Sequence, residues 1–154
     1  MADGPDSRAA LVEFLATLGV GVDRRVELKR ILSVWAEDGH VASDAAVRFV
    51  GLFDGITFEY PRHPLTGGTY ECVLDAVRAT RATYSTRVRE YERRTGQSLA
   101  PVGLAESNHV TLMIAPDGGV LGGYDDFLAL YGENGEVALW NIYHRVLPVR
   151  LPMA

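Results

Sequence analysis

Apolar residues recur with helical spacing along the first third of the chain. Residues 7–18, 26–38 and 43–53 each place apolar side chains three and four positions apart, on one face of a helix. A glycine follows each segment within two residues, and glycine commonly ends helices because it adopts the left-handed conformation without steric cost. Asp6 stands at the N-cap position of the first segment. We therefore predict three N-terminal helices.

The spacing changes to that of strands after residue 55. Apolar and polar residues alternate over 56–60 and again over 70–75, as in half-buried strands that form a hairpin with a long loop. Two later strands are expected, one over 110–115 and one beginning at Val120, because the Pro-Asp-Gly-Gly sequence between them is typical of a tight turn. The pattern thus predicts adjacent strands in the middle of the chain.

Helical spacing returns twice in the second half. An arginine-rich middle helix is predicted over 76–95, where Gly96 ends it, and a C-terminal helix over 133–145. Helices at both ends with adjacent strands between them are typical of an α+β fold with a largely antiparallel sheet. We expect a single domain over 1–154, with residues 1–6 flexible. The side chains predicted to lie in the core are Phe49, Phe53, Phe58, Tyr84 and Trp140.

Composition agrees with one globular domain, since the chain has 154 residues and 47% of them are apolar. Its single cysteine, Cys72, cannot form an intramolecular disulfide, which is typical of proteins in reducing compartments. The sequence has no apolar run of bilayer length and no basic start followed by an apolar stretch. We therefore expect a cytoplasmic protein that does not contact membranes. Fourteen arginines against one lysine indicate a GC-rich, actinobacterial kind of genome.

The distribution of charge favours a basic protein partner over nucleic acid. The net charge is −5, whereas proteins that bind phosphate backbones rely on clustered lysine and arginine. The predicted helix over 76–95 does carry six arginines, but its tyrosines have core spacing, which favours a solvated amphipathic helix. Residues 97–144 contain six acidic residues and neither lysine nor arginine. Such a segment either attracts a basic partner or merely disperses solubilising charge.

No constellation of reactive side chains in the sequence points to catalysis or to a metal. The four histidines lack the spacing of metal ligands, and Cys72 lacks the local signature of a nucleophile. The paired glycines suit hairpin turns, a bulge or a strand end rather than a phosphate loop, because no Lys-Ser or Lys-Thr follows them. We therefore predict no catalytic residue, no metal and no cofactor. A small-ligand pocket around Glu59, His63 and Tyr70 is an alternative.

Five motifs stand in order along the chain. They are LGVGVDRRV at 18–26, RFVGLFDGITF at 48–58, YERRTGQSLAPVG at 91–103, LMIAPDGGV at 112–120, and YG at 131–132 followed by EVAL at 136–139. Together they resemble the SUKH superfamily, most closely its third immunity-protein subfamily, over about residues 15–148. The chain departs from that family's pattern where Asp54 replaces the first glycine of a pair, and where Val20 and Leu121 replace aromatic residues.

The resemblance implies an α+β immunity protein of a bacterial polymorphic toxin system, which neutralises a cognate toxin, such as a nuclease or a deaminase, by binding it. It carries over no catalytic residue. A basic toxin surface would match the acidic segment over 97–144. The alternatives are a non-catalytic interaction scaffold and a small-ligand-binding α+β domain. The candidate toxin-binding residues are acidic and aromatic side chains of that segment, namely Asp117, Tyr124, Asp125, Asp126, Phe127, Tyr131, Glu133 and Glu136.

Overall fold

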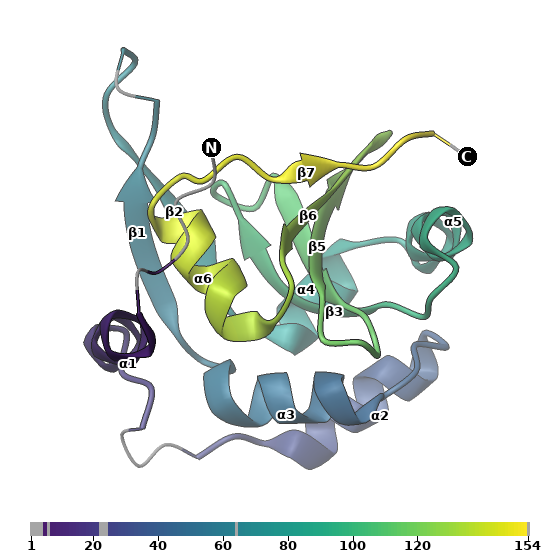
Figure 1. Ribbon diagram of the computed structural model, residues 1–154. Coiled ribbons are helices and arrows are strands. Elements are labelled where there is room, and N and C mark those ends of the chain that lie inside the picture. Colours follow the sequence, from purple (N-terminus) through teal and green to yellow (C-terminus); the bar gives the residue numbers. More distant parts are fainter. Residues whose placement is uncertain (1–4, 6, 22–24, 64, 154) are drawn as a thin grey trace.

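The strands of the central sheet follow one another in the order in which they occur along the chain. In the computed structural model, which describes residue 5 and residues 7–21, 25–63 and 65–153, seven strands form one antiparallel sheet (Figure 1). The strands are β1 Thr57–Pro61, β2 Thr69–Val73, β3 Ala100–Ala105, β4 Val110–Ile114, β5 Val120–Tyr124, β6 Phe127–Gly132 and β7 Val149–Arg150. The helices are α1 Arg8–Thr17, α2 Leu28–Glu37, α3 Asp44–Phe53, α4 Ala76–Ala82, α5 Ser85–Thr95 and α6 Gly135–Tyr143. The predicted α+β fold with an antiparallel sheet is confirmed.

Serine side chains cap two of the three N-terminal helices. At α1 the Oγ of Ser7 accepts a hydrogen bond from the backbone N–H of Ala10 (3.1 Å), and at α3 the Oγ of Ser43 accepts one from Ala46 (3.1 Å). Ser7 therefore occupies the N-cap position that we predicted one residue earlier. Asp6 lies outside the described residues, as does the segment expected to be flexible, 1–6, apart from residue 5.

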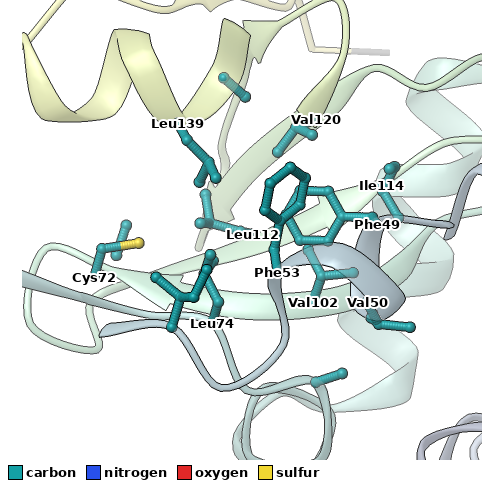
Figure 2. Packing of buried hydrophobic residues seen from close by; sticks show 14 of the residues in the cluster. Phe49, Val50, Phe53, Cys72, Leu74, Val102, Leu112, Ile114, Val120 and Leu139 are labelled. Carbon is teal, nitrogen blue, oxygen red and sulfur yellow. The ribbon is translucent and has the colours of Figure 1, made fainter. Parts of the chain in front are cut away.

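Apolar side chains cover both faces of the sheet. Phe49 and Phe53 of α3 pack with Leu112 of β4 in the larger core, which also includes residues of α6 (Figure 2). On the opposite face Tyr91 of α5 packs with Met113 of β4 in a second, smaller core. Because neighbouring residues of a strand point to opposite faces, β4 is buried on both sides, and all its residues except Thr111 are apolar.

The helix predicted over 76–95 is in fact two helices. The backbone is extended at Thr83 and Tyr84, between α4 and α5, and the hydroxyl of Thr83 exchanges a hydrogen bond with Thr111 of β4 (2.7 Å). The break leaves the Tyr84 side chain 84% exposed, so its predicted place in the core is wrong. Trp140 is only partly buried at the edge of the larger core. The other predicted core residues, Phe49, Phe53 and Phe58, are buried.

The two predicted hairpins are confirmed, but three strands were not predicted. In the first hairpin Phe58 of β1 lies opposite Cys72 of β2, and in the second Met113 of β4 lies opposite Leu121 of β5. The strands that were missed are β3, β6 and β7. No residue of β3 or β6 is exposed, so no alternation with polar residues marks them, and β7 has only two residues.

Candidate functional site

A pocket lined by five aromatic rings lies between the first hairpin, the β5–β6 hairpin and the end of α6. Its volume is about 330 Å³. The rest of the wall comes from three segments. They are Glu106 in the turn between β3 and β4, Asn141 and Ile142 of α6, and residues 145–148. We call this site the aromatic pocket. The rings are those of Tyr60, Tyr70, Tyr124, Phe127 and Tyr131.

The curl of the sheet brings the two hairpins to the same helix. β1 and β6 are the first and sixth strands of the sheet, yet both contact α6, which lies between them in Figure 1. Each hairpin contributes a cross-strand pair of rings. Tyr60 lies opposite Tyr70 with ring centroids 5.8 Å apart, and Tyr124 lies opposite Phe127 with centroids 4.9 Å apart. Such pairs stabilise a sheet, and their rings give it a large apolar surface.

Two adjacent glycines in β5 make room for tyrosine rings on opposite faces of the sheet. A Cβ atom at Gly122 would overlap the ring of Tyr131, and one at Gly123 would lie 2.7 Å from the ring of Tyr91. We expected this glycine pair to form a bulge or a strand end. Instead both residues lie within β5, where the absence of a side chain permits the close approach of the rings.

The turn between β3 and β4 holds Glu106 in an unusual backbone conformation. Glu106, Ser107 and Asn108 have φ values of 48°, 54° and 78°, which are uncommon for residues other than glycine. Ser107 donates its backbone N–H to the carbonyl of Glu71 (3.0 Å) and accepts the N–H of Glu71 at its Oγ (3.1 Å), while Asn108 Oδ1 accepts from Arg78 (2.9 Å). Such conformations persist where the surrounding structure determines them. The turn is therefore tied to β2 and α4.

The polar groups of the aromatic pocket are mostly uncharged. The hydroxyl of Tyr60, a residue only 6% exposed, accepts a hydrogen bond from the backbone N–H of Glu106 (2.8 Å). Burial raises the pKa of both Tyr60 and Tyr131, and the negative charge of Glu106 adds to the increase. Asn141 donates from Nδ2 to the carbonyl of Tyr131 (2.8 Å), whereas its Oδ1 is buried without a partner among the described residues.

The eight nominated toxin-binding residues divide among several places. Asp117 and Glu133 line a second groove of about 640 Å³ together with Arg94. Glu136, on α6, forms an ion pair with Arg48 of α3 (3.1 Å). The three nominated aromatic residues do come together in the aromatic pocket, and they are Tyr124, Phe127 and Tyr131.

Asp125 and Asp126 form the turn between β5 and β6, and arginines of α5 lie beside them. Arg87 donates to the backbone carbonyl of Asp125 (3.1 Å), and Arg94 donates to that of Asp126 (2.9 Å). The hydroxyl of Tyr91 also donates to the Asp125 carbonyl (2.9 Å). The acidic segment contains no basic residue of its own, yet the fold surrounds this turn with charge of mixed sign.

The comparison with known families supports the resemblance seen in the motifs. The sequence profile described as SUKH-3 immunity protein matches residues 23–144. The chain belongs to this family. The matched range includes every wall of the aromatic pocket except residues 145–148. The chain shows no significant match to a curated protein or to a solved structure.

In this SUKH-3 protein the three residues of the alternative site, Glu59, His63 and Tyr70, do not all line the aromatic pocket. Only Tyr70 lines the aromatic pocket; Glu59 accepts a hydrogen bond from the Thr69 hydroxyl (3.4 Å), and His63 Nδ1 accepts from the backbone N–H of Leu65 (3.1 Å) in an exposed loop. Among the residues that the structure describes, no three His, Cys, Asp or Glu side chains gather in a way that could hold a metal ion. Within the same residues, no helix is both long and apolar enough to cross a membrane.

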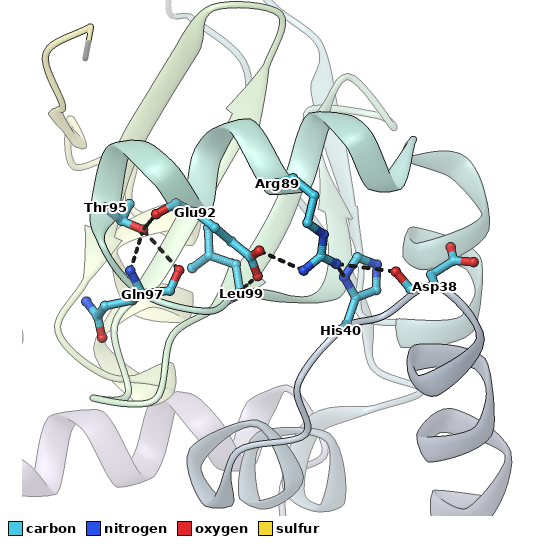
Figure 3. Close-up of polar contacts among 7 residues, drawn as sticks. All are labelled: Asp38, His40, Arg89, Glu92, Thr95, Gln97 and Leu99. Atoms are coloured by element: carbon cyan, nitrogen blue, oxygen red, sulfur yellow. Dashed lines mark hydrogen bonds and ion pairs between the residues drawn. The ribbon is translucent and has the colours of Figure 1, made fainter.

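The SUKH-3 chain also contains a partly buried polar network that joins α5 to the segment after α2 (Figure 3). Arg89 contacts Glu92 (2.7 Å), the backbone carbonyl of Asp38 (3.3 Å) and Nδ1 of His40, and Glu92 in turn accepts the N–H of Leu99 (2.7 Å). His40 is 5% exposed, and burial followed by the charge of Arg89 lowers its pKa. The network shares no residue with the aromatic pocket, and its contacts join α5 to the segment after α2 and to Leu99, just before β3.

Sequence reasoning missed four important elements of the aromatic pocket. Tyr60 appears in the sequence only as one apolar position of an alternating strand, and Glu106 only as one of six dispersed acids. Asn141 carried no signal of its own, and Gly122 was noticed only as one of a glycine pair, because the roles of both residues depend on contacts with Tyr131. The detectable signal was the density of aromatic residues around the Asp125–Asp126 turn.

Proposed function

We propose that this SUKH-3 protein protects the cell that produces it by binding a cognate toxin domain through the face around the aromatic pocket. Membership of an immunity protein family supports the protective role. The convergence of five aromatic rings on one pocket supports the location, since aromatic residues are enriched in the energetically important parts of interfaces. In the wall of the pocket Leu147 is 87% exposed, and Val149, which follows the wall residues in the sequence, is 65% exposed; exposed apolar groups of this kind are typical of contact surfaces.

Within this proposal Tyr124, Phe127 and Tyr131 are the anchors, and Asp125 and Asp126 lie at the rim. The toxin surface is basic, as in the substrate groove of a nuclease or a deaminase, and the bound immunity protein closes that groove to nucleic acid. Both proteins meet in the cytoplasm, where a nucleic-acid-directed toxin acts. The protein works by binding, without a catalytic step, a metal or a cofactor. The remaining nominated acids, Asp117, Glu133 and Glu136, contact the toxin only if the interface extends beyond the pocket.

The test is co-expression with the toxic domain encoded immediately upstream. We expect the wild-type chain to restore growth and to co-purify with the toxin. The variant Phe127→Ala should weaken the complex by about 30-fold, since truncating an interface anchor costs about 2 kcal/mol or more. The matched control is Tyr84→Ala, because Tyr84 is exposed but does not line the pocket. Cell death in the presence of the wild-type chain, with no complex recovered, would refute the proposal.

A small-ligand-binding function is the second candidate, and the pocket volume favours it. A volume of about 330 Å³ lies at the lower end of the range for small-molecule sites. Native mass spectrometry of the purified chain tests this function directly. A stoichiometric mass increment that disappears in Tyr131→Ala would support it, and a spectrum of the unmodified chain alone would count against it.

A further inference from the structure

The lining of the aromatic pocket combines aromatic rings with a glutamate. The faces of tyrosine and phenylalanine rings carry negative electrostatic potential, so they attract cations. Glu106 adds a full negative charge to the same wall. The ion pairs among the described residues are Arg48–Glu136, Arg87–Glu90 and Arg89–Glu92, and none of them uses Glu106. Its carboxylate is therefore available for a cation from outside the chain.

Arginines of the chain itself already lie on two of the five rings. The guanidinium carbon of Arg62 is 4.5 Å from the centroid of the Tyr70 ring, and that of Arg150 is 5.6 Å from the centroid of the Phe127 ring. Both distances fall within the range of cation–π contacts. Two rings of the pocket thus already contact guanidinium groups within the chain itself.

We propose that the aromatic pocket receives a basic side chain, arginine or lysine, from the toxin, with the cationic end held by the tyrosine rings and the carboxylate of Glu106. This inference rests on the proposed function and names the chemistry of the partner at that site. The volume of about 330 Å³ suits a single long side chain rather than a helix. An acidic side chain would instead meet both Glu106 and the negative ring faces.

The turn that carries Glu106 is suited to this role because it is ordered in advance. Ser107 and Asn108 tie it to β2 and α4, and the Glu106 backbone donates to the hydroxyl of Tyr60. A backbone that is already in position loses less conformational entropy on binding than a mobile loop does. Burial, and after it the charge of Glu106, raises the pKa of Tyr131, which is consistent with Glu106 lying near this ring.

Arg145 is the cationic residue in the wall, and it provides an internal test. It is exposed and follows the end of α6 with a φ of 58°. Its charge opposes the entry of another cation. Replacing it with glutamine removes the charge and keeps a long side chain at the same backbone position, so Arg145→Gln should bind cations several-fold more tightly than the wild type.

The direct experiment is an NMR titration of the purified chain carrying ¹³C-labelled tyrosine rings. The probes are N-acetyl-arginine amide, N-acetyl-lysine amide and the neutral isostere N-acetyl-citrulline amide, at constant ionic strength. We expect saturable shifts of the Tyr60 and Tyr131 signals with the two cationic probes, with dissociation constants on the order of millimolar. Tyr84 should not shift. Shifts of equal size with citrulline, or no saturable shift with either cation, would overturn the inference.

Two conservative variants test whether the Glu106 carboxylate contributes to binding of the cationic probes. Glu106→Gln should weaken binding of the arginine probe by about ten-fold, whereas Glu133→Gln, in the second groove, should leave it unchanged. Equal affinity in Glu106→Gln and the wild type contradicts the role of Glu106.

Co-expression separates this inference from the proposed function. If the wild type protects cells and Glu106→Gln weakens the complex, the proposed function and the role of the pocket are both supported. If Glu106→Gln protects and binds the toxin as well as the wild type does, the basic side chain does not enter this pocket, although the protein still acts by binding. If the wild type itself fails to protect, the proposed function is wrong whatever the pocket binds.

Discussion

The ring of Tyr131 occupies the space that a side chain at Gly122 would fill. This contact couples a strand of the central sheet to the wall of the aromatic pocket. It also explains why a glycine stands within β5, where it contributes nothing to packing by itself. The shape of the pocket therefore depends on a residue that has no side chain.

Replacement of Gly122 by alanine should destabilise the protein. The new methyl group would overlap Tyr131 and lie 2.8 Å from Val110 Cγ1, and overpacking of this kind costs about 1–3 kcal/mol. Urea unfolding followed by circular dichroism measures the effect. Gly51→Ala is the control, because Gly51 lies on α3 with open space around it, and alanine there should add about 0.5–1 kcal/mol. Equal stability of the two variants would disprove the crowding at position 122.

Arg89 should matter more for stability than Arg93, although both lie on α5. Arg89→Ala leaves the Glu92 carboxylate, which is largely buried, without its ion pair and removes the contacts to the segment after α2. We expect a loss of about 1–3 kcal/mol in the free energy of unfolding. The exposed Arg93 serves as the control, since truncating a surface residue usually changes stability by no more than about 0.5 kcal/mol. A comparable effect of both substitutions would show that the network contributes little.

The protonation of His40 should make stability depend on pH below neutrality. Burial, and after it the charge of Arg89, lowers the His40 pKa below the ordinary value of 6.5, so the unfolded chain binds this proton more tightly than the folded one. The contribution to stability is complete above pH 6.5 and is lost as the pH falls towards the folded-state pKa. Unfolding free energies measured between about pH 8 and pH 5 should decline in the wild type, and less steeply in His40→Gln. Parallel curves for the two proteins would argue against this assignment.

Neutralising the β5–β6 turn should slow association with a basic toxin. Asp125 has a φ of 46°, and asparagine tolerates this conformation, so Asp125→Asn with Asp126→Asn should keep the turn and leave the melting temperature nearly unchanged. The neighbouring arginines bind backbone carbonyls, which the substitutions preserve. We expect a lower association rate constant and a weaker dependence on salt in stopped-flow measurements. Unchanged kinetics would place the interface elsewhere, with the arginines of α4 and α5 as the next surface to test.

The sequence was sufficient for the parts of the fold that local periodicity determines. Alternation over 56–60 and 70–75 predicted the first hairpin, and helical spacing correctly identified Phe49 and Phe53 as core residues. The break between α4 and α5 escaped prediction because it depends on the contact of Thr83 with Thr111, a residue distant in the sequence. Local spacing alone fits one continuous helix.

The candidate site shows the same division between local and distant information. Tyr124, Phe127 and Tyr131 were identified because they are close in the sequence to acidic residues and to one another. Tyr60 and Glu106 join them only through the curl of the sheet, which no local pattern encodes. Likewise, the arginines beside Asp125 and Asp126 come from α5, so a count of charges along 97–144 does not describe the charge of the folded surface.

The strand order of the sheet affects the order in which the sheet and the aromatic pocket can form during translation. Each strand pairs with the strand synthesised just before it, so the nascent chain can extend the sheet from β1 onwards as it leaves the ribosome. The aromatic pocket departs from this order, because it joins Tyr60 of β1 to Asn141 and residues 145–148. The pocket is therefore closed only when residues 145–148 have emerged, after strands β1 to β6 have all been synthesised.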